Sequence, residues 1–81
     1  MRLPRNLSGE DLTKQLSVFG YKITRQTGSH MRLTTHERGE HHITIPRHPS
    51  LRIGTLASAL SDVALHFNLD RQELMARLFK K

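Results

Sequence analysis

Six histidines are the side chains of this sequence best suited to acid–base chemistry. An imidazole has an ordinary pKa of about 6.5, so near neutral pH it can take a proton from one group and return it to another. In RNA the nucleophile is already present as the 2′-hydroxyl beside each phosphate, so one positioned base with nearby cations can start cleavage. His30 follows Gly28 and Ser29 directly and is our candidate for this role, although spacing alone makes it one of several exposed histidines.

Metal binding is the alternative use of these histidines. His41 and His42 are adjacent, and His36 precedes them across a turn. Neighbouring residues of a strand point to opposite faces, so His41 and His42 cannot ligate one ion together without distortion. The chain has no cysteine, and no cluster of carboxylates completes a tetrahedral set of ligands. We therefore expect neither a metal nor another cofactor.

The charge of the chain indicates a polyanion as its partner. Thirteen Lys and Arg against seven Asp and Glu give a formal net charge of +6, although small domains are also basic for solubility alone. One Tyr, three Phe and no Trp offer little for base stacking, so contacts to phosphate should dominate. The basic residues that we expect to bind RNA are Lys22, Arg25, Arg32, Arg47 and Arg52.

Length and composition limit the architecture. We expect a single domain over residues 1–81, with residues 1–7 as a short N-terminal arm, because a chain of this size holds one hydrophobic core. Without cysteine, no disulfide can stabilise it. No apolar run approaches the roughly 18 residues of a membrane helix, and the first residues lack the apolar stretch of a signal peptide. We expect a cytoplasmic protein that does not enter the membrane.

Along the sequence, helices are expected before and after a set of three strands. The first runs from about Ser8 to Phe19, because Ser8 and Asp11 fit a capping box and Gly20 supplies the stop. The second begins near Gly54, and apolar residues at helical spacing give it one buried stripe. The members of that stripe are Leu56, Leu60, Val63 and Phe67.

A third, short helix follows the capping pattern of Asp70 and Glu73. His66, late in the second helix, is expected to be solvated or to act as a cation at the helix end. The solvated face of the last helix should carry Arg71, Arg77, Lys80 and Lys81.

Between the first two helices the sequence predicts three strands, which cover Tyr21–Gln26, His30–His36 and His41–Ile45. Apolar residues alternate with polar ones in each, so one face of the sheet is buried and the other is open. The residues expected on the buried face are Tyr21, Ile23, Met31, Leu33, Ile43 and Ile45. Those expected on the open face are Lys22, His30, Arg32, Thr34, His36, His42 and Thr44.

The shared buried face restricts how the second and third strands pair. A three-residue loop ending at Gly39 sets His30 opposite Pro46, whereas one ending at Glu40 sets it opposite His48. The preference of glycine for the left-handed position favours the first register. Either register brings His30 close to the loop that contains His48, which makes His48 the candidate partner of His30.

The order of elements is α-β-β-β-α with an extra short C-terminal helix. Strands that are apolar on one face only imply a three-stranded antiparallel sheet with the helices covering one side. The fold class is therefore α+β, with one sheet face left to solvent or to a ligand.

Several short motifs occur in a fixed order along the chain: Ser8-Gly9, Gly20-Tyr21, Gly28-Ser29-His30, Ile45-Pro46-Arg47-His48 and Gly54-Thr55-Leu56. From about Ser8 to Leu60 the sequence resembles the HicA toxins, and the ordered combination is more specific than any single motif. The resemblance implies a fold like that of double-stranded RNA-binding domains and the role of toxin in a type II toxin–antitoxin system. It also implies metal-independent cleavage of messenger RNA and inhibition by a HicB antitoxin encoded beside the toxin.

The same resemblance assigns the catalytic role to His30, with Gly28 shaping the turn that presents it and Ser29 as a candidate helper. Homodimerisation within the toxin–antitoxin complex is a further expectation. The sequence departs from the family pattern beyond Leu60, because Ser61 to His66 continue the second helix without the usual glycine-containing break.

Two functions of other classes remain open from the sequence. One is a non-catalytic RNA-binding module of the same fold, which grips duplex RNA by shape and phosphate contacts. The other is an interaction protein whose open sheet face binds an acidic partner.

Overall fold

The computed structural model describes residues 6–79. Along the chain the elements are α1 (Gly9–Leu16), the 3-10 turn η1 (Ser17–Phe19), β1 (Lys22–Thr27), β2 (His30–Thr35), β3 (His41–Pro46), α2 (Ile53–Phe67) and α3 (Arg71–Leu78). This order confirms the α+β architecture predicted from the sequence, including the short C-terminal helix. Residues 1–5 of the expected N-terminal arm, together with Lys80 and Lys81, lie outside the described residues.

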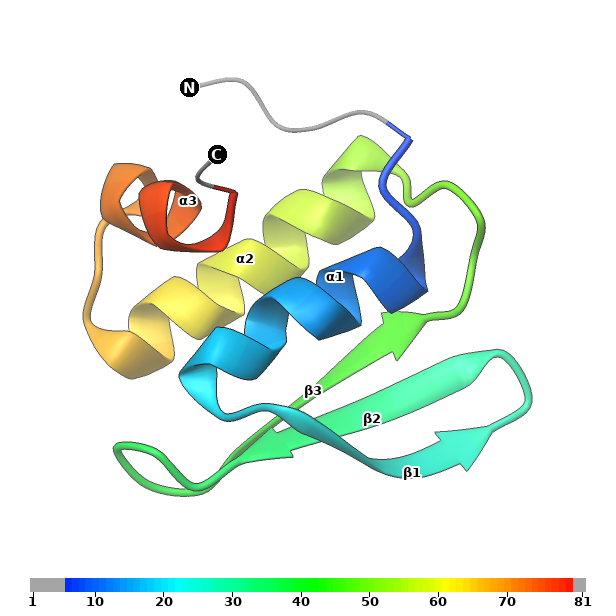
Figure 1. Cartoon of the computed structure of the whole chain (residues 1–81), viewed down its shortest axis with the longest axis horizontal. Coiled ribbons are helices and arrows are strands. Elements are labelled where there is room, and N and C mark those ends of the chain that lie inside the picture. The colour runs from blue at the N-terminus through cyan, green and yellow to red at the C-terminus, as the bar shows by residue number, and fades with distance from the viewer. Residues whose placement is uncertain (1–5, 80–81) are drawn as a thin grey trace.

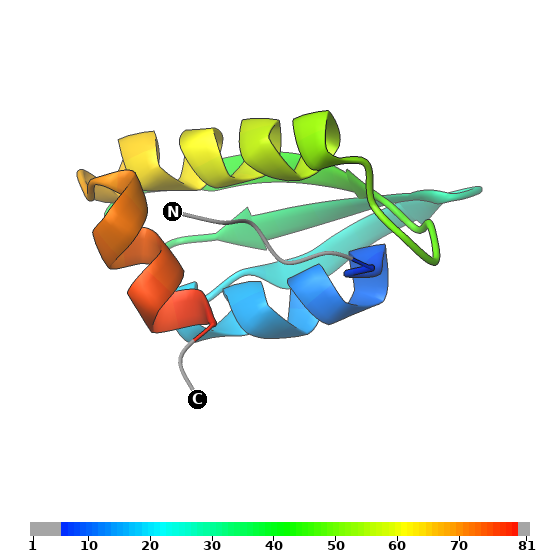
Figure 2. The same ribbon diagram turned by 90° about the horizontal axis from the view of Figure 1, so that it is seen from above.

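The elements form two layers (Figure 1). The three strands make one antiparallel sheet in the order β1-β2-β3, so β2 is the central strand. Seen from above, the strands pass beneath α1 and α2, and α3 crosses at one end of this helix pair (Figure 2). The helices of the described residues therefore share one side of the sheet, as expected, and the other face is open.

The helix ends follow local signals of the sequence. The Ser8 hydroxyl accepts a hydrogen bond from the Asp11 backbone N–H at 2.9 Å, and the Asp11 carboxylate accepts from the Ser8 N–H at 3.3 Å. At α3 the Asp70 carboxylate accepts from the Glu73 N–H at 2.7 Å. α2 ends at Asn68, whose φ of 56° lies in the left-handed region. The predicted capping box of α1 is confirmed, whereas at α3 only the N-cap hydrogen bond of Asp70 is present among the described residues.

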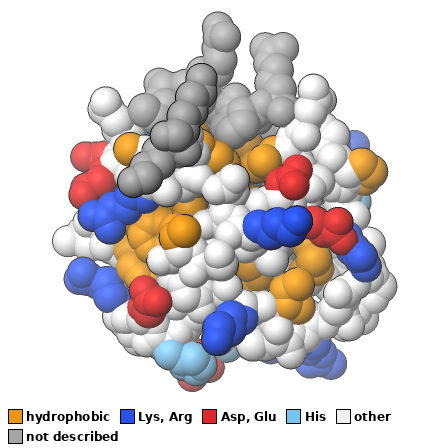
Figure 3. Space-filling model, viewed as in Figure 1, with side chains coloured by type: hydrophobic (Ala, Val, Ile, Leu, Met, Phe, Trp, Pro, Cys, Tyr) orange, Lys and Arg blue, Asp and Glu red, His pale blue; other side chains and the backbone are white. Residues whose placement is uncertain are grey.

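One hydrophobic core lies between the sheet and the helices. It includes the predicted stripe of α2 and the predicted buried residues of the sheet, with Ile23 as the exception: Tyr21, Met31, Leu33, Ile43, Ile45, Leu56, Leu60, Val63 and Phe67. Ile23 is 48% exposed because β1 is an edge strand that α1 covers incompletely. Its side chain lines a hollow of about 350 Å³ between β1 and α1, and the prediction that it is buried was wrong. Apolar side chains are visible between charged ones on the side of the molecule drawn in Figure 3.

The pairing of β2 with β3 follows the register favoured by the sequence. His30 lies opposite Pro46, and the ladder continues to Thr35 opposite His41. In the turn between these strands Gly39 has a φ of 98°, which glycine adopts without steric cost. The alternative register, with His30 opposite His48, is excluded. β2 ends one residue before the predicted His36.

The start of β1 depends on Gly20. Its φ is +84°, and a Cβ added there would lie 2.5 Å from Oε2 of Glu37 and 2.8 Å from the hydroxyl of Thr35. That hydroxyl donates to the Phe19 carbonyl at 2.7 Å and accepts from the Glu37 N–H at 3.1 Å. The end of β2 is thereby tied to η1, and the contact leaves no room for a side chain at Gly20.

Replacing Gly20 by alanine should lower the free energy of unfolding by about 2 kcal/mol or more, since the variant combines a left-handed backbone with a steric overlap. The matched control is Gly54→Ala in α2, where the added methyl group meets nothing within 4 Å apart from its chain neighbours and the nearby backbone of its own helix. That change should raise the free energy of unfolding by about 0.5 kcal/mol, because alanine restricts the unfolded chain. Urea denaturation of both variants checks the pair, and equal effects would contradict the role given to Gly20.

Candidate functional site

His30 is the first residue of β2 and is exposed. It follows a two-residue turn, since Thr27 and His30 face each other across the β1–β2 pair. Gly28 takes the first central position of this turn with a φ of +57°, as the hairpin turn of type II′ requires. The turn therefore presents His30 at the rim of the open face, with Ser29 exposed beside it.

The loop after β3 lies against this turn. The Arg47 N–H donates to the Ser29 carbonyl, which extends the β2–β3 ladder by one residue beyond His30 and Pro46. The His48 carbonyl in turn accepts from the Gly9 N–H at 2.9 Å, at the start of α1. The imidazole of His48 is exposed, and no hydrogen bond between it and His30 occurs in the structure of residues 6–79.

Strand pairing arranges the open face in three rows across the sheet. Residues at alternate positions of one strand are about 7 Å apart, so each row follows the previous one by that distance. From the His30 end, the rows are Thr27, His30 and Pro46; then Arg25, Arg32 and Thr44; then Lys22, Thr34 and His42. A line of cations thus leads away from His30 along β1 and β2.

Two of these cations stand directly opposite each other. Arg25 of β1 pairs with Arg32 of β2, and both side chains are exposed. Like charges directly opposite each other on a sheet are destabilising. Within the described part of the chain neither residue takes part in an ion pair, whereas Arg47 and Arg77 do. The second row is therefore an unneutralised cationic patch beside His30.

The remaining two basic residues expected to bind RNA lie elsewhere. The Arg47 guanidinium contacts the Glu10 carboxylate of α1 at 2.7 Å, on the helix side of the sheet. Arg52 precedes α2 as its N-terminal cap residue and belongs to the layer of helices. The structure thus brings Lys22, Arg25 and Arg32 together with His30 on one face and leaves Arg47 and Arg52 apart from them.

A hydrogen-bonded chain at the far row was not foreseen from the sequence. His42 donates from Nε2 to the Glu40 carboxylate, and its Nδ1 hydrogen-bonds with the Thr34 hydroxyl, both at 2.7 Å. The Thr34 hydroxyl also contacts that of Thr24 at 2.8 Å. Thr34 was expected to be exposed but is only 6% exposed, because the side chains of its neighbours cover it. The signal was the spacing of Glu40, just before β3, and His42, the second residue of that strand.

A second group of aromatic and histidine side chains joins the β2–β3 turn to α2. The Tyr21 hydroxyl hydrogen-bonds with Nδ1 of His41 at 2.7 Å, and burial, with a smaller contribution from Asp62, raises the pKa of Tyr21 to about 12. The rings of His41 and His66 stack with centroids 4.4 Å apart. Nε2 of His66 donates to the carbonyls of Glu37 at 2.9 Å and Gly39 at 3.1 Å. His66 lies in the last turn of α2, as expected, but its contacts with the β2–β3 turn were not foreseen from the sequence.

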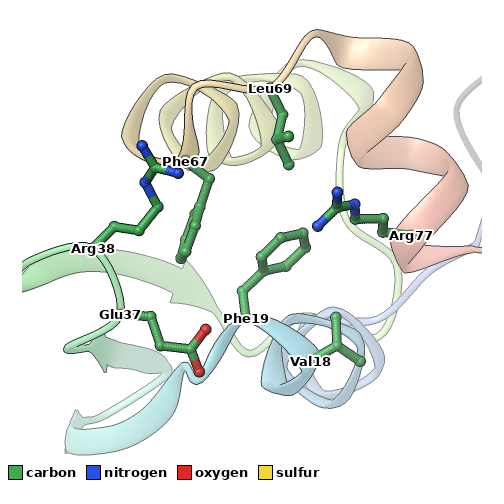
Figure 4. Close-up of a pocket in the computed structure, with 7 residues that line it drawn as sticks. All are labelled: Val18, Phe19, Glu37, Arg38, Phe67, Leu69 and Arg77. Atoms are coloured by element: carbon green, nitrogen blue, oxygen red, sulfur yellow. The ribbon is translucent and has the colours of Figure 1, made fainter.

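A hollow of about 490 Å³ lies at the opposite end of β2 from His30 (Figure 4). Phe19 and Phe67 form its apolar wall, and the guanidinium groups of Arg38 and Arg77 lie at its edge (Figure 4). Its lining includes the carboxylate of Glu37 but no residue of the open face or of the turn before His30. The hollow is therefore separate from the candidate site at His30.

In residues 6–79 no group of three or more His, Cys, Asp or Glu is placed so that it could hold a metal ion. None of the helices in the same part of the chain combines the length and the apolar character needed to cross a bilayer.

Comparison with known proteins gives one match. A family model described as "HicA toxin of bacterial toxin-antitoxin" matches residues 9–65, well over half of the chain. The matched part runs from α1 into α2 and includes the whole sheet and the turn before His30. No curated protein matches the chain, and no solved structure does.

The stacked histidines should make stability depend on pH. Burial, and then the proximity of His66, lower the pKa of His41 from its ordinary value of 6.5. As the pH falls through 6.5, the His41 imidazole therefore takes up a proton in the unfolded chain but not in the folded protein. The free energy of unfolding should be highest above pH 6.5 and fall below it, until the lower pKa of the folded state is passed. Urea denaturation between pH 8 and pH 5 measures this decrease.

His41→Gln should reduce the decrease between pH 8 and pH 5, because glutamine has no proton to gain. His36→Gln, which removes an exposed histidine after β2, is the control and should leave it unchanged. An unaltered pH dependence in His41→Gln would contradict the assignment.

Proposed function

The chain belongs to the HicA toxin family of bacterial toxin–antitoxin systems, and we propose from this premise that it is a ribonuclease that cleaves messenger RNA at His30. The observation that carries the proposal is the position of His30 on the open face. It stands at the rim of that face, next to the row formed by Arg25 and Arg32, and is exposed. A flexible RNA strand can approach such a surface without entering a cleft.

In the proposed reaction, His30 takes the proton of a 2′-hydroxyl group. The 2′-oxygen then forms a bond to the adjacent phosphorus, and the bond from phosphorus to the 5′-oxygen of the next nucleotide breaks. The leaving oxygen receives a proton, and the products end in a 2′,3′-cyclic phosphate and a 5′-hydroxyl. The reaction needs no oxidant and no group beyond the RNA and a proton carrier.

The cations of the second row would stabilise the negative charge that develops on the phosphate. Arg32 lies two residues from His30 on the same face of β2, at about 7 Å along the strand, and Arg25 faces it. Lys22 in the third row extends the positive charge along the strand of RNA. Each phosphate contact also makes binding depend on salt, since it releases a counterion.

Three further residues would support His30. Gly28 provides the backbone geometry of the turn, and Ser29 beside it offers a hydroxyl at the rim. His48 is the candidate for a second proton-transfer group, because its loop is tied to the turn through Arg47 and Ser29. Its exposed ring is free to turn toward a bound phosphate.

A toxin of this family has an antitoxin partner, and the open face suggests how that partner would inhibit it. We propose that a HicB-type antitoxin covers His30 or its rim and places carboxylates against Arg25 and Arg32. Complementary charge would speed association and exclude RNA from the same surface. The cytoplasm, where messenger RNA and the antitoxin are both present, is the proposed location.

Purified protein should cleave RNA, and His30→Ala should slow cleavage by about 10²–10⁴-fold, the usual contribution of one acid–base group. His36→Ala, which removes another exposed histidine, is the matched control and should retain activity. Addition of EDTA should have no effect on the wild-type rate. Cleavage by His30→Ala at the wild-type rate would contradict the assignment, and RNA binding without cleavage by the wild type would favour the non-catalytic alternative.

A further inference from the structure

We propose that Thr24 is a positioning residue: the bulge at Thr24 sets which side of the sheet Arg25 occupies and so completes the cationic row beside His30. The inference rests on the proposed function, because it concerns how the RNA surface is built. The pairing of β1 with β2 is irregular at this point. Ile23 faces Leu33 and Arg25 faces Arg32, so Thr24 has no partner of its own.

Strict alternation along β1 would give a different surface. From Ile23, which faces the helix side with Leu33, a regular strand would place Thr24 opposite Arg32 and Arg25 opposite Met31. Arg25 would then lie on the helix side. The extra residue at Thr24 reverses the alternation, as a β-bulge does, and moves Arg25 to the open face.

Hydrogen bonds of the Thr24 side chain hold the bulge. Its hydroxyl contacts the Thr34 hydroxyl at 2.8 Å and lies 3.4 Å from the Arg32 carbonyl. Thr34 is fixed in turn by Nδ1 of His42, and Glu40 holds the other ring nitrogen of His42. This series of hydrogen bonds thus connects Thr24, on the exposed edge strand β1, to the buried hydroxyl of Thr34 in the central strand.

Folding alone does not favour this placement of Arg25. On the open face its charge stands directly opposite that of Arg32. In the regular pairing it would take the place of Gln26 beside the hollow that Glu10 of α1 also lines, whose carboxylate already pairs with Arg47. The bulge therefore places two arginines directly opposite each other on the open face. A bound polyanion that contacts both arginines attracts each of them and so offsets their mutual repulsion.

Three variants distinguish effects of the position of Arg25 from effects of the Thr24 hydroxyl itself. Thr24→Val keeps the shape of the side chain and removes the hydroxyl, so the strand should slip to regular pairing. Thr24→Ser keeps the hydroxyl and should retain the bulge. Deletion of Thr24 makes the pairing regular and still leaves Arg25 opposite Arg32, because the residues after it keep their partners.

The first measurement is made on the free protein. In NMR spectra, the cross-strand contact between the Hα atoms or side chains of Arg25 and Arg32 should be present in the wild type, in Thr24→Ser and in the deletion variant. In Thr24→Val it should be replaced by a contact between Arg25 and Met31. Retention of the Arg25–Arg32 pairing in Thr24→Val would overturn the proposal, whatever the protein does with RNA.

The second measurement is the affinity for a short RNA with 2′-O-methyl riboses, which offers no hydroxyl nucleophile. Thr24→Val should bind severalfold more weakly than the wild type, to the same extent as Arg25→Ala, with the slope of log affinity against log salt reduced by about 0.7 for one lost contact. Thr24→Ser and the deletion variant should bind like the wild type.

Weak RNA binding by a folded deletion variant would overturn the positional role of Thr24. The deletion variant tests this role even if Thr24→Val does not fold. If Arg25→Ala binds RNA like the wild type, the open face is not the RNA surface and the functional part of the inference fails. The pairing seen by NMR would in that case still decide whether Thr24 sets the bulge.

Discussion

The pairing of β2 with its two neighbours is the constraint on which the rest of the structure depends. Met31 and Leu33 of this strand are buried in the core, so His30 and Arg32, at the alternate positions, must face away from the helices. A slip by one residue would bury a histidine and an arginine and expose the core residues. The same hydrophobic burial that stabilises the fold therefore presents the candidate site.

Much of this arrangement could be predicted from the sequence, because its causes are local or periodic. The capping residues of α1 and α3 act within a few residues, and the alternation of β2 and β3 fixes their faces. The left-handed preference of Gly39 selected the observed register between two that shared the same faces. These features do not depend on where distant segments pack.

The features that were missed depend on contacts between distant segments. The exposure of Ile23 reflects how much of the edge strand α1 covers, and His66 binds the β2–β3 turn, 27 and 29 residues away along the chain. The bulge at Thr24 depends on hydroxyl contacts with β2 that no propensity scale describes. Among the candidate site residues, the ion pair of Arg47 with Glu10 across the sheet edge has the same origin. Sequence patterns locate the strands, but tertiary contacts decide which cations share the face of His30.

The open face combines a cost in stability with a use in binding. Arg25 and Arg32 repel each other in the free protein, whereas RNA or a carboxylate-bearing antitoxin would neutralise both. The central claim is that His30 activates the 2′-hydroxyl of RNA, and the ends of the cleaved RNA test this most directly. Incubation of the purified protein with RNA should give 5′-hydroxyl ends and 2′,3′-cyclic phosphates, and a deoxyribose at the cleaved position should block the cut. Products with 5′-phosphate ends, or cleavage beside a deoxyribose, would contradict the account.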